Sequence, residues 1–202
     1  SVDAKVSYTG RLKSNPLNHS LREGGIDWTL LGLTMTGRIR MRTIKKLLED
    51  VIEKNIPGDV IETGVWRGGT SIYMRGILDA YHQPHRASYV CDSFSGLPPS
   101  EYKNDKIMKW DHSPYLEVSV DQVMHNFVTS GLYTENIIFA KGFFSNTLPI
   151  LGKQKITFSI LRLDGDMYES TVDALYNLYD KLSVGGYIYI DDWGIYPAKH
   201  AC

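Results

Sequence analysis

Acidic residues follow two apolar runs late in the sequence. Asp164 and Asp166 come directly after one run, and the pair Asp191 and Asp192 comes directly after the next. Carboxylates at adjacent strand ends repel one another unless a cation neutralises them. Oxygen ligands suit a hard ion such as Mg²⁺, which can also lower the pKa of a hydroxyl held against it. Three or four of these carboxylates are therefore predicted to hold a metal ion, and solvated turn aspartates are the alternative for Asp191 and Asp192 taken alone.

A second candidate site is the glycine-containing turn after Glu62. The segment 58–71 is predicted to run from a strand through this turn into a helix. Its spacing is neither GxxxxGK[ST] nor GxGxxG, and the Glu62 carboxylate would repel a pyrophosphate. A ligand with a cationic amino group fits better, and S-adenosylmethionine carries an ammonium and a sulfonium. The alternative is a plain turn that packs the strand against the helix, because lone glycine-rich turns are weak signals.

Asp92 ends the next apolar run and is the third candidate. It lies roughly 20–30 residues past the glycine turn, near the range where an acidic residue binds a ribose diol in dinucleotide folds. A carboxylate can accept hydrogen bonds from both hydroxyls. A turn or capping aspartate is the alternative, but the pairing with Glu62 favours a ligand-binding role.

Short apolar runs alternate with amphipathic stretches along most of the chain. This alternation predicts βαβ units and a doubly wound, mostly parallel α/β sheet whose strand ends would carry the three candidate sites. The runs predicted as strands are 59–62, 88–91, 137–140, 157–163 and 187–190, and the predicted helices are 42–55, 70–82, 119–130 and 170–182.

The segment 93–116 interrupts this alternation, and residues 1–18 show no clear periodicity. Long polar loops inside compact domains are usually lids or disordered. We predict that residues 95–115, with part of the N-terminal arm, close over the bound ligands, and that Trp110 and Tyr115 contact the substrate. His112 is predicted to be an exposed loop histidine.

The composition is that of one globular domain and disfavours a nucleic-acid partner or a membrane span. The chain has 202 residues, 43% of them hydrophobic, and a net charge of −1. A nucleic-acid partner usually requires a basic excess, and a membrane span needs roughly 20 consecutive apolar residues. Neither pattern is present, so the expected partner is a small molecule. With only two cysteines, a disulfide framework is not expected, and the cytoplasm is the expected location.

Four ordered segments resemble the macrocin O-methyltransferase family, which includes sugar O-methyltransferases of macrolide and aminocoumarin biosynthesis. They are 62–69 (ETGVWRGG), 92–99 (DSFSGLPP), 161–171 (LRLDGDMYEST) and 185–193 (GGYIYIDDW). The likeness runs from about Thr34 to the end of the sequence. It implies a class I, Rossmann-like methyltransferase fold and Mg²⁺-dependent methyl transfer from S-adenosylmethionine to a sugar hydroxyl.

The resemblance also implies roles for particular residues. It places the metal on Asp164, Asp191 and Asp192. The residues themselves make Asp166 a reserve ligand, since Gly165 could turn either carboxylate inward, and we expect Asp164 or a metal-bound water to take the hydroxyl proton. The expected donor-binding residues lie at the ends of the first two strands and after the third. Of these, Gly142 and Phe143 are expected near the adenine. The full set is Glu62, Thr63, Gly64, Gly68, Ser71, Asp92, Ser93, Gly142 and Phe143.

The expected organisation is an arm with lid elements over residues 1–33 and a methyltransferase domain over residues 34–202. Family members continue after the Asp pair with a helix and two more strands, so the sheet is expected to lack its last two strands. The apolar edge at residues 187–190 would then favour a homo-oligomer. A non-catalytic binding domain derived from such an enzyme is the alternative function, and a nucleotide-handling enzyme is a third, disfavoured by Glu62.

Overall fold

The computed structural model describes residues 4–6, 12–14, 19–25, 29–108 and 113–194. Its centre is a five-stranded sheet in the order β5-β4-β3-β6-β7, and every neighbouring pair is parallel. The doubly wound α/β class is therefore confirmed, and each predicted strand is present. The strands are β3 (Asp59–Thr63), β4 (Ser88–Asp92), β5 (Ile137–Lys141), β6 (Phe158–Leu163) and β7 (Leu182–Ile190).

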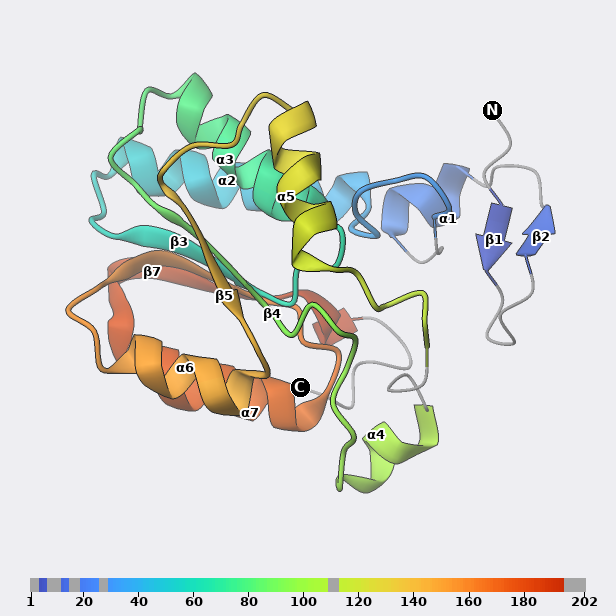
Figure 1. Ribbon diagram of the computed structural model, residues 1–202. Coiled ribbons are helices and arrows are strands. Elements are labelled where there is room, and N and C mark those ends of the chain that lie inside the picture. Colours follow the sequence, from blue (N-terminus) through green and yellow to red (C-terminus); the bar gives the residue numbers. More distant parts are fainter. Residues whose placement is uncertain (1–3, 7–11, 15–18, 26–28, 109–112, 195–202) are drawn as a thin grey trace.

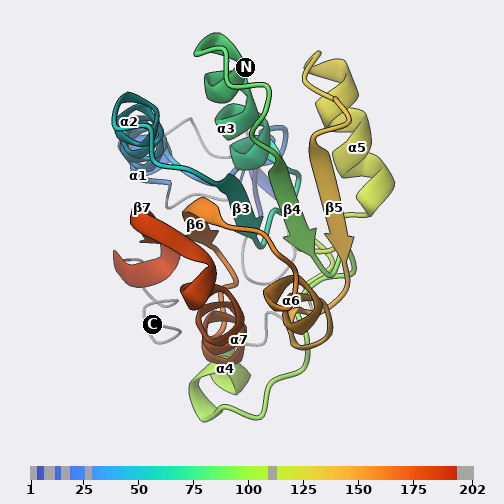
Figure 2. The ribbon, with the colours of Figure 1, turned by 90° about the vertical axis from the view of Figure 1, so that its left-hand side faces the viewer.

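Helices cover both faces of this sheet (Figures 1 and 2). One face carries α2 (Arg38–Glu53), α3 (Gly69–Ala80) and α5 (Val120–Thr129), and the other carries α6 (Phe144–Gly152) and α7 (Tyr168–Leu178). Side chains alternate between the two faces along each strand. Thus Val60 and Ile160 pack against α2 and α3, whereas Ile61 and Leu161 pack against α6 and α7.

The alternation and the register together position polar side chains at the strand ends. Glu62 of β3 lies opposite Arg162 of β6 in the parallel register. Both residues are two positions beyond Val60 and Ile160, so they face α2 and α3. Asp164 follows Arg162 by another two positions. The chain order reverses between β3 and β6, which is where doubly wound folds bind ligands.

Several elements differ from the sequence predictions. Helix α2 begins at Arg38 rather than Arg42, and α6 lies where no helix was predicted, because its interior Pro149 is a residue that usually ends helices. The arm, predicted as irregular, contains a small antiparallel pair of strands and a short helix. These are β1 (Ala4–Val6), β2 (Leu12–Ser14) and α1 (His19–Gly24).

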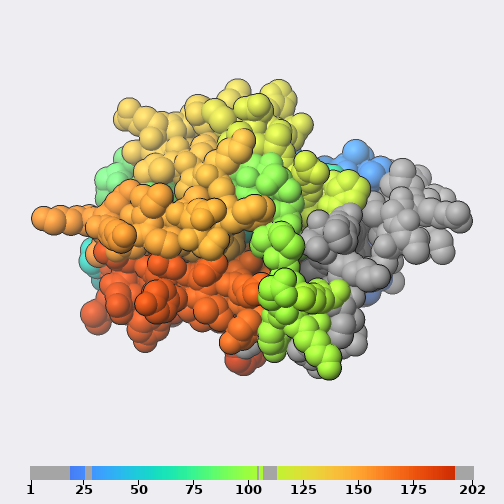
Figure 3. All heavy atoms as spheres, turned by 60° about the horizontal axis from the view of Figure 1, so that its bottom comes forward, coloured from blue at the N-terminus to red at the C-terminus, as the bar shows by residue number. Residues whose placement is uncertain are grey.

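The segment predicted as a lid contains the short helix α4 (Lys103–Met108). Asp105 on α4 accepts a hydrogen bond from the backbone N–H of Tyr168 in the first turn of α7 (3.0 Å), and Tyr102 stacks on Tyr168 with ring centroids 4.4 Å apart. Figure 3 shows the light green atoms of α4 beside the orange-red atoms of α7. Helix α4 is therefore packed against α7. Trp110 and His112 lie outside the described residues.

None of the helices in the described ranges is both long and apolar enough to pass through a bilayer.

Candidate active site

A cavity of about 520 Å³ opens at the carboxyl edge of the sheet. Its walls include the ends of β3, β4, β6 and β7 and the start of α6. Among the predicted site residues, those lining it are Glu62, Gly64, Asp92, Ser93, Phe143, Asp164, Asp191 and Asp192, together with the reserve residue Asp166. The tertiary structure thus brings together carboxylates that are widely separated in the sequence.

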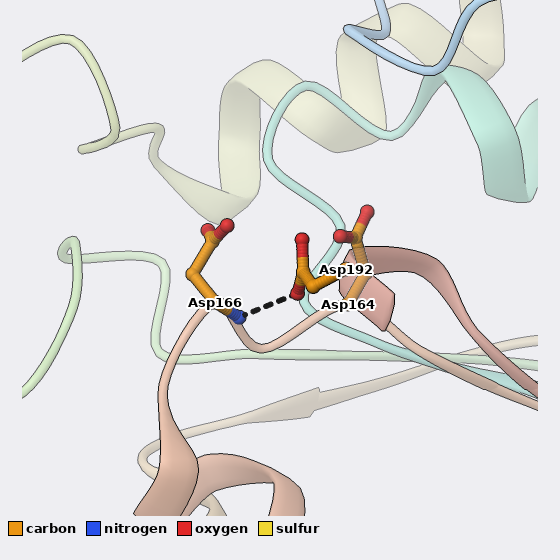
Figure 4. Close-up of side chains that lie close together, drawn as sticks. All are labelled: Asp164, Asp166 and Asp192. Carbon is orange, nitrogen blue, oxygen red and sulfur yellow. Dashed lines mark hydrogen bonds between the residues drawn. The ribbon is translucent and has the colours of Figure 1, made fainter. Parts of the chain in front are cut away.

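Three carboxylates form a compact acidic group at this edge of the sheet. Asp164, Asp166 and Asp192 each place one carboxylate oxygen within 4.8 Å of the others, and the Asp166 N–H donates to Asp192 Oδ2 at 3.2 Å. In Figure 4 their carboxylates extend to the same side of the loops that carry them. Asp166 has φ +59°, a left-handed backbone conformation that is uncommon outside glycine. Asp166 adopts this conformation in the loop that follows β6.

The electrostatics of this group favour a cation. Burial, followed by repulsion from Asp164, raises the pKa of Asp192 to about 7. Burial also raises the pKa of Asp166 well above its usual value, with the charges of Asp192 and Asp164 adding to the effect. Because oxygen donors converge and repel one another here, these residues fit a hard divalent ion.

Asp191 lies beside this group but is engaged differently. Its carboxylate is buried and pairs with Arg40 of α2 and, at 2.8 Å, with Nη2 of Arg162. Sequence reasoning placed Asp191 among the ligands and Asp166 in reserve, whereas in this arrangement Asp166 belongs to the compact group and two guanidinium groups neutralise Asp191. The predicted role of Asp191 in metal binding stays a prediction.

Two arginines of this site, Arg162 and Arg40, were not predicted from the sequence, and Arg162 is the more central. It is fully buried on β6, pairs with Glu62 and with Asp164 Oδ2 (2.7 Å), and donates to Thr36 Oγ1 at 2.9 Å. Burial lowers the pKa of Arg162, but the carboxylates of Asp164 and Glu62 outweigh it and hold the pKa above its usual value. A single arginine inside an apolar strand was the available signal, since a buried charge requires partners.

Glu62 is held by two neighbours. Ser71 donates to one of its oxygens and Arg162 to the other. Burial raises the pKa of Glu62 to about 7, against the opposing attraction of Arg162. The two predicted donor-site residues Glu62 and Ser71 are therefore in direct contact, and Ser71 orients the carboxylate.

Asp92 organises the backbone of the turn at residues 64–69, which we call the donor turn because the methyl donor is predicted to bind there. Its carboxylate accepts hydrogen bonds from the N–H groups of Val65 (2.8 Å), Trp66 (3.3 Å) and Phe94 (2.8 Å), and from Ser93 Oγ (3.3 Å). Burial raises the pKa of Asp92, and these hydrogen bonds oppose the shift. A carboxylate offers about four acceptor positions. A ribose hydroxyl would therefore share or displace one of these bonds.

The glycines of the donor turn allow close packing. Gly64 has φ +87°, and a Cβ there would lie 1.8 Å from the carbonyl oxygen of Asp164. At Gly68 a Cβ would lie 2.7 Å from the Val123 side chain of α5. The carbonyl oxygen of Thr63 accepts a hydrogen bond from the Asp164 N–H at 2.8 Å. These residues therefore bring the donor turn against the metal-site loop, and the ligand contact predicted for them stays a prediction.

Gly142 and Phe143 lie at the third strand end. The Gly142 N–H donates to the carbonyl oxygen of Asp92 at 2.9 Å, which connects this turn to the one after β4. Phe143 precedes α6 and lines the cavity. Phe143 therefore faces the cavity, and the contact with the adenine predicted for Gly142 and Phe143 stays a prediction.

Comparison with known proteins identifies the family. A family profile described as Macrocin-O-methyltransferase (TylF) matches residues 4–202. The chain is 42% identical over 189 residues to demethyldecarbamoylnovobiocin O-methyltransferase of Streptomyces niveus, covering 92% of this chain and 71% of that protein. It is 37% identical over 186 residues to mycinamicin III 3''-O-methyltransferase of Micromonospora griseorubida, covering 89% and 72%.

Solved structures agree with this assignment. The O-methyltransferase NovP matches with a TM-score of 0.85 at 44% identity, covering 91% of this chain and 77% of that chain. The calicheamicin methyltransferase CalS11 matches with a TM-score of 0.58 at 19% identity, over 78% of this chain and 65% of that chain, which is a likeness of fold alone. The chain belongs to the macrocin O-methyltransferase family and is a methyltransferase.

Proposed function

We propose that this methyltransferase moves a methyl group from S-adenosylmethionine to a hydroxyl of a glycosylated natural product, with a divalent metal, Mg²⁺, at the acidic group. The observation that carries the proposal is the single cavity that holds Glu62 at one strand end and the carboxylates of Asp164, Asp166 and Asp192 at the next two. The relatives named above act on natural products, one at a 3''-hydroxyl position.

The donor would lie along the ends of β3, β4 and β5. Glu62 carries the carboxylate that attracts a cationic amino group, and Ser71 and Arg162 fix its orientation. Asp92 and Ser93 face the same cavity and would approach the ribose. Phe143 offers an aromatic side chain at the adenine end.

The metal would be held by Asp164 and Asp192, with Asp166 and Asp191 as the further candidates. When bound, such an ion lowers the pKa of a hydroxyl placed against it. Asp164 is our proposed proton acceptor. Its Oδ2 pairs with Arg162, which leaves Oδ1 for the hydroxyl. Asp166 is the second candidate, because its carboxylate lies in the same compact group as that of Asp164.

A methyl-transfer assay with labelled donor tests the proposal. We expect transfer to glycosylated natural products but not to their sugar-free forms, and loss of transfer on chelation with EDTA. Asp192→Asn should lower kcat by about 100-fold or more and leave donor affinity unchanged, on the scale of losing one catalytic electrostatic contact. The matched control is Asp180→Asn, an exposed residue after α7, which should keep full activity.

Two outcomes would contradict separate parts of the proposal. Undiminished methyl transfer in EDTA would contradict the role of the metal. Equal transfer to sugar-free acceptors would contradict a sugar hydroxyl as the methyl acceptor.

A further inference from the structure

Residues 29–36, which we call the strap, run along the donor turn and are fastened to it through backbone groups. Arg67 Nη1 donates to the carbonyl oxygens of Leu30 (2.9 Å) and Gly32 (3.0 Å). The Gly69 N–H donates to the carbonyl oxygen of Leu33 at 2.9 Å. Because these contacts use strap carbonyls, they depend on the path of the strap rather than on its side chains.

A second segment meets the strap at the same place. The Trp66 Nε1–H donates to the carbonyl oxygen of Tyr115 at 2.9 Å, and the two rings lie 5.2 Å apart. The Tyr115 hydroxyl donates to the carbonyl oxygen of Thr29 in the strap. The Arg67 guanidinium carbon lies 4.1 Å from the Trp66 ring centre and 5.4 Å from that of Tyr115. Arg67 therefore joins the donor turn, the strap and the end of the lid segment.

These segments form part of the cavity wall. The cavity is lined by three strap residues, Thr34, Met35 and Thr36. It is also lined by Trp66, which Arg67 contacts, and by Leu116, which follows Tyr115. Separating the strap from the donor turn would therefore open the cavity beside Glu62. The strap also has a firm attachment farther along, where Arg40 donates to the carbonyl oxygen of Met35 at 3.2 Å.

The backbone at Trp66 is strained in the closed arrangement. Its φ of +48° lies in the left-handed region, which a bulky residue adopts at a cost. Such conformations persist only where the surroundings determine them, and they cluster at ligand clamps. Here the surroundings are Asp92, which accepts from the Trp66 N–H, and the Arg67 and Tyr115 contacts. Losing Arg67 would remove one of these constraints.

We propose that Arg67 is a positioning residue that holds the strap and the segment 113–118 closed against the donor turn, and so sets the rate at which the donor and its product leave the cavity. The identity of the ligand rests on the proposed function. Arg67 does not line the cavity itself, so its effect is exerted through Trp66 and the strap. Its substitution should change the exchange of the ligand more than its bound geometry.

The experiment measures dissociation of labelled S-adenosylmethionine in a chase without acceptor. We expect Arg67→Ala to raise the dissociation rate about tenfold, the scale for losing charged hydrogen bonds and a ring contact. Arg67→Lys should show an intermediate rise, because lysine keeps the charge but not the flat face. Tyr115→Phe removes the hydroxyl bond to Thr29 and keeps the ring, and should raise the rate about threefold. Arg42→Ala, an exposed arginine on α2, is the matched control and should leave the rate unchanged.

Hydrogen exchange provides the second readout. The Gly69 amide, which is bonded to Leu33 in the closed strap, should exchange faster in Arg67→Ala and Tyr115→Phe than in the control. Equal dissociation rates in wild type, Tyr115→Phe and Arg67→Lys would overturn the role of Arg67, even if Arg67→Ala failed to fold. Absence of donor binding in the wild type would overturn the proposed function and this role together, so the two failures are distinguishable.

Discussion

The charge balance of the site depends on two arginines, the fully buried Arg162 and the partly buried Arg40. Arg162 contacts Glu62, Asp164 and Asp191, and Arg40 contacts Asp191 from α2. Removing one partner of a buried ion pair leaves an uncompensated charge, which is more costly than losing the attraction alone. The two arginines therefore explain how so many carboxylates can share one strand edge, and why the remaining repulsion concentrates on Asp166 and Asp192.

This remaining repulsion predicts a pH-dependent effect of Mg²⁺ on stability. The folded-state pKa of Asp192 is about 7, above its ordinary value of 3.8. Between these values the folded protein keeps a proton that the unfolded chain has released, so without metal the free energy of unfolding falls as pH rises from about 4 to about 7. A divalent ion binds the ionised carboxylates. Saturating Mg²⁺ should therefore raise Tm by several degrees at about pH 8 and by little at about pH 5.5.

Thermal unfolding at the two pH values, with and without Mg²⁺, measures this effect. Asp192→Asn should lose the difference, and Asp180→Asn, with its exposed carboxylate, should retain it. A rise in Tm of the same size at both pH values would be inconsistent with ionisation of Asp192 on metal binding.

At the scale of elements, the donor turn and the metal-site loop are positioned against each other by backbone contact. The Asp164 N–H donates to the carbonyl oxygen of Thr63, and Gly64 has no room for a side chain against Asp164. Any displacement of the turn after β3 therefore displaces Asp164. This turn and the loop that carries Asp164 are mechanically one unit.

Gly64 and Gly131 both have a left-handed backbone, but only Gly64 is closely packed. Substituting each by alanine therefore distinguishes a steric clash from backbone strain alone. A Cβ at Gly64 would lie 1.8 Å from Asp164, whereas a Cβ at Gly131 (φ +70°) meets nothing within 4 Å. Gly131→Ala should cost about 1–2 kcal/mol of unfolding free energy, the usual penalty of the left-handed region. Gly64→Ala should cost more than about 3 kcal/mol, because the backbone itself must move. Urea unfolding measures both, and equal costs would argue against the packing role of Gly64.

At the scale of the molecule, β7 is the outermost strand on its side of the described sheet. Val184 on this strand is fully exposed, and Tyr187 to Ile190 are half-buried. Unpaired strands template pairing with another chain.

We therefore predict that the 202-residue chain self-associates through β7. Light scattering over a dilution series should show a mass that falls on dilution, and Val184→Lys should shift the equilibrium toward single chains, because a charged side chain on an edge strand opposes pairing. Methyl transfer per molecule should fall in parallel, since Asp191 and Asp192 follow the same strand. A single-chain mass and constant specific activity at all concentrations would contradict the prediction.

The sequence alone determined the strands, their parallel pairing and the edge of the sheet that carries the candidate site residues. Buried parallel strands need apolar side chains on both faces, so each appears as a short apolar run. Residues at the carboxyl ends of such strands share one edge of the sheet, which is why Glu62, Asp92, Asp164 and Asp192 could be placed together from their positions in the chain. The family was recognisable for the same reason, since its motifs are these strand ends.

Only the tertiary structure decided which of the carboxylates face one another. Residue spacing identifies the end of a strand but not its register against a neighbouring strand. The ion pairs that neutralise the buried charges join residues that are far apart in the sequence. Arg162 meets Glu62 across 100 positions, and Arg40 meets Asp191 across 151. The strap likewise reaches the donor turn through backbone carbonyls, as in the contact of Arg67 with Leu30, which no side-chain pattern encodes. These interactions depend on packing between elements, because a buried charge or carbonyl takes the partner that the fold brings within reach.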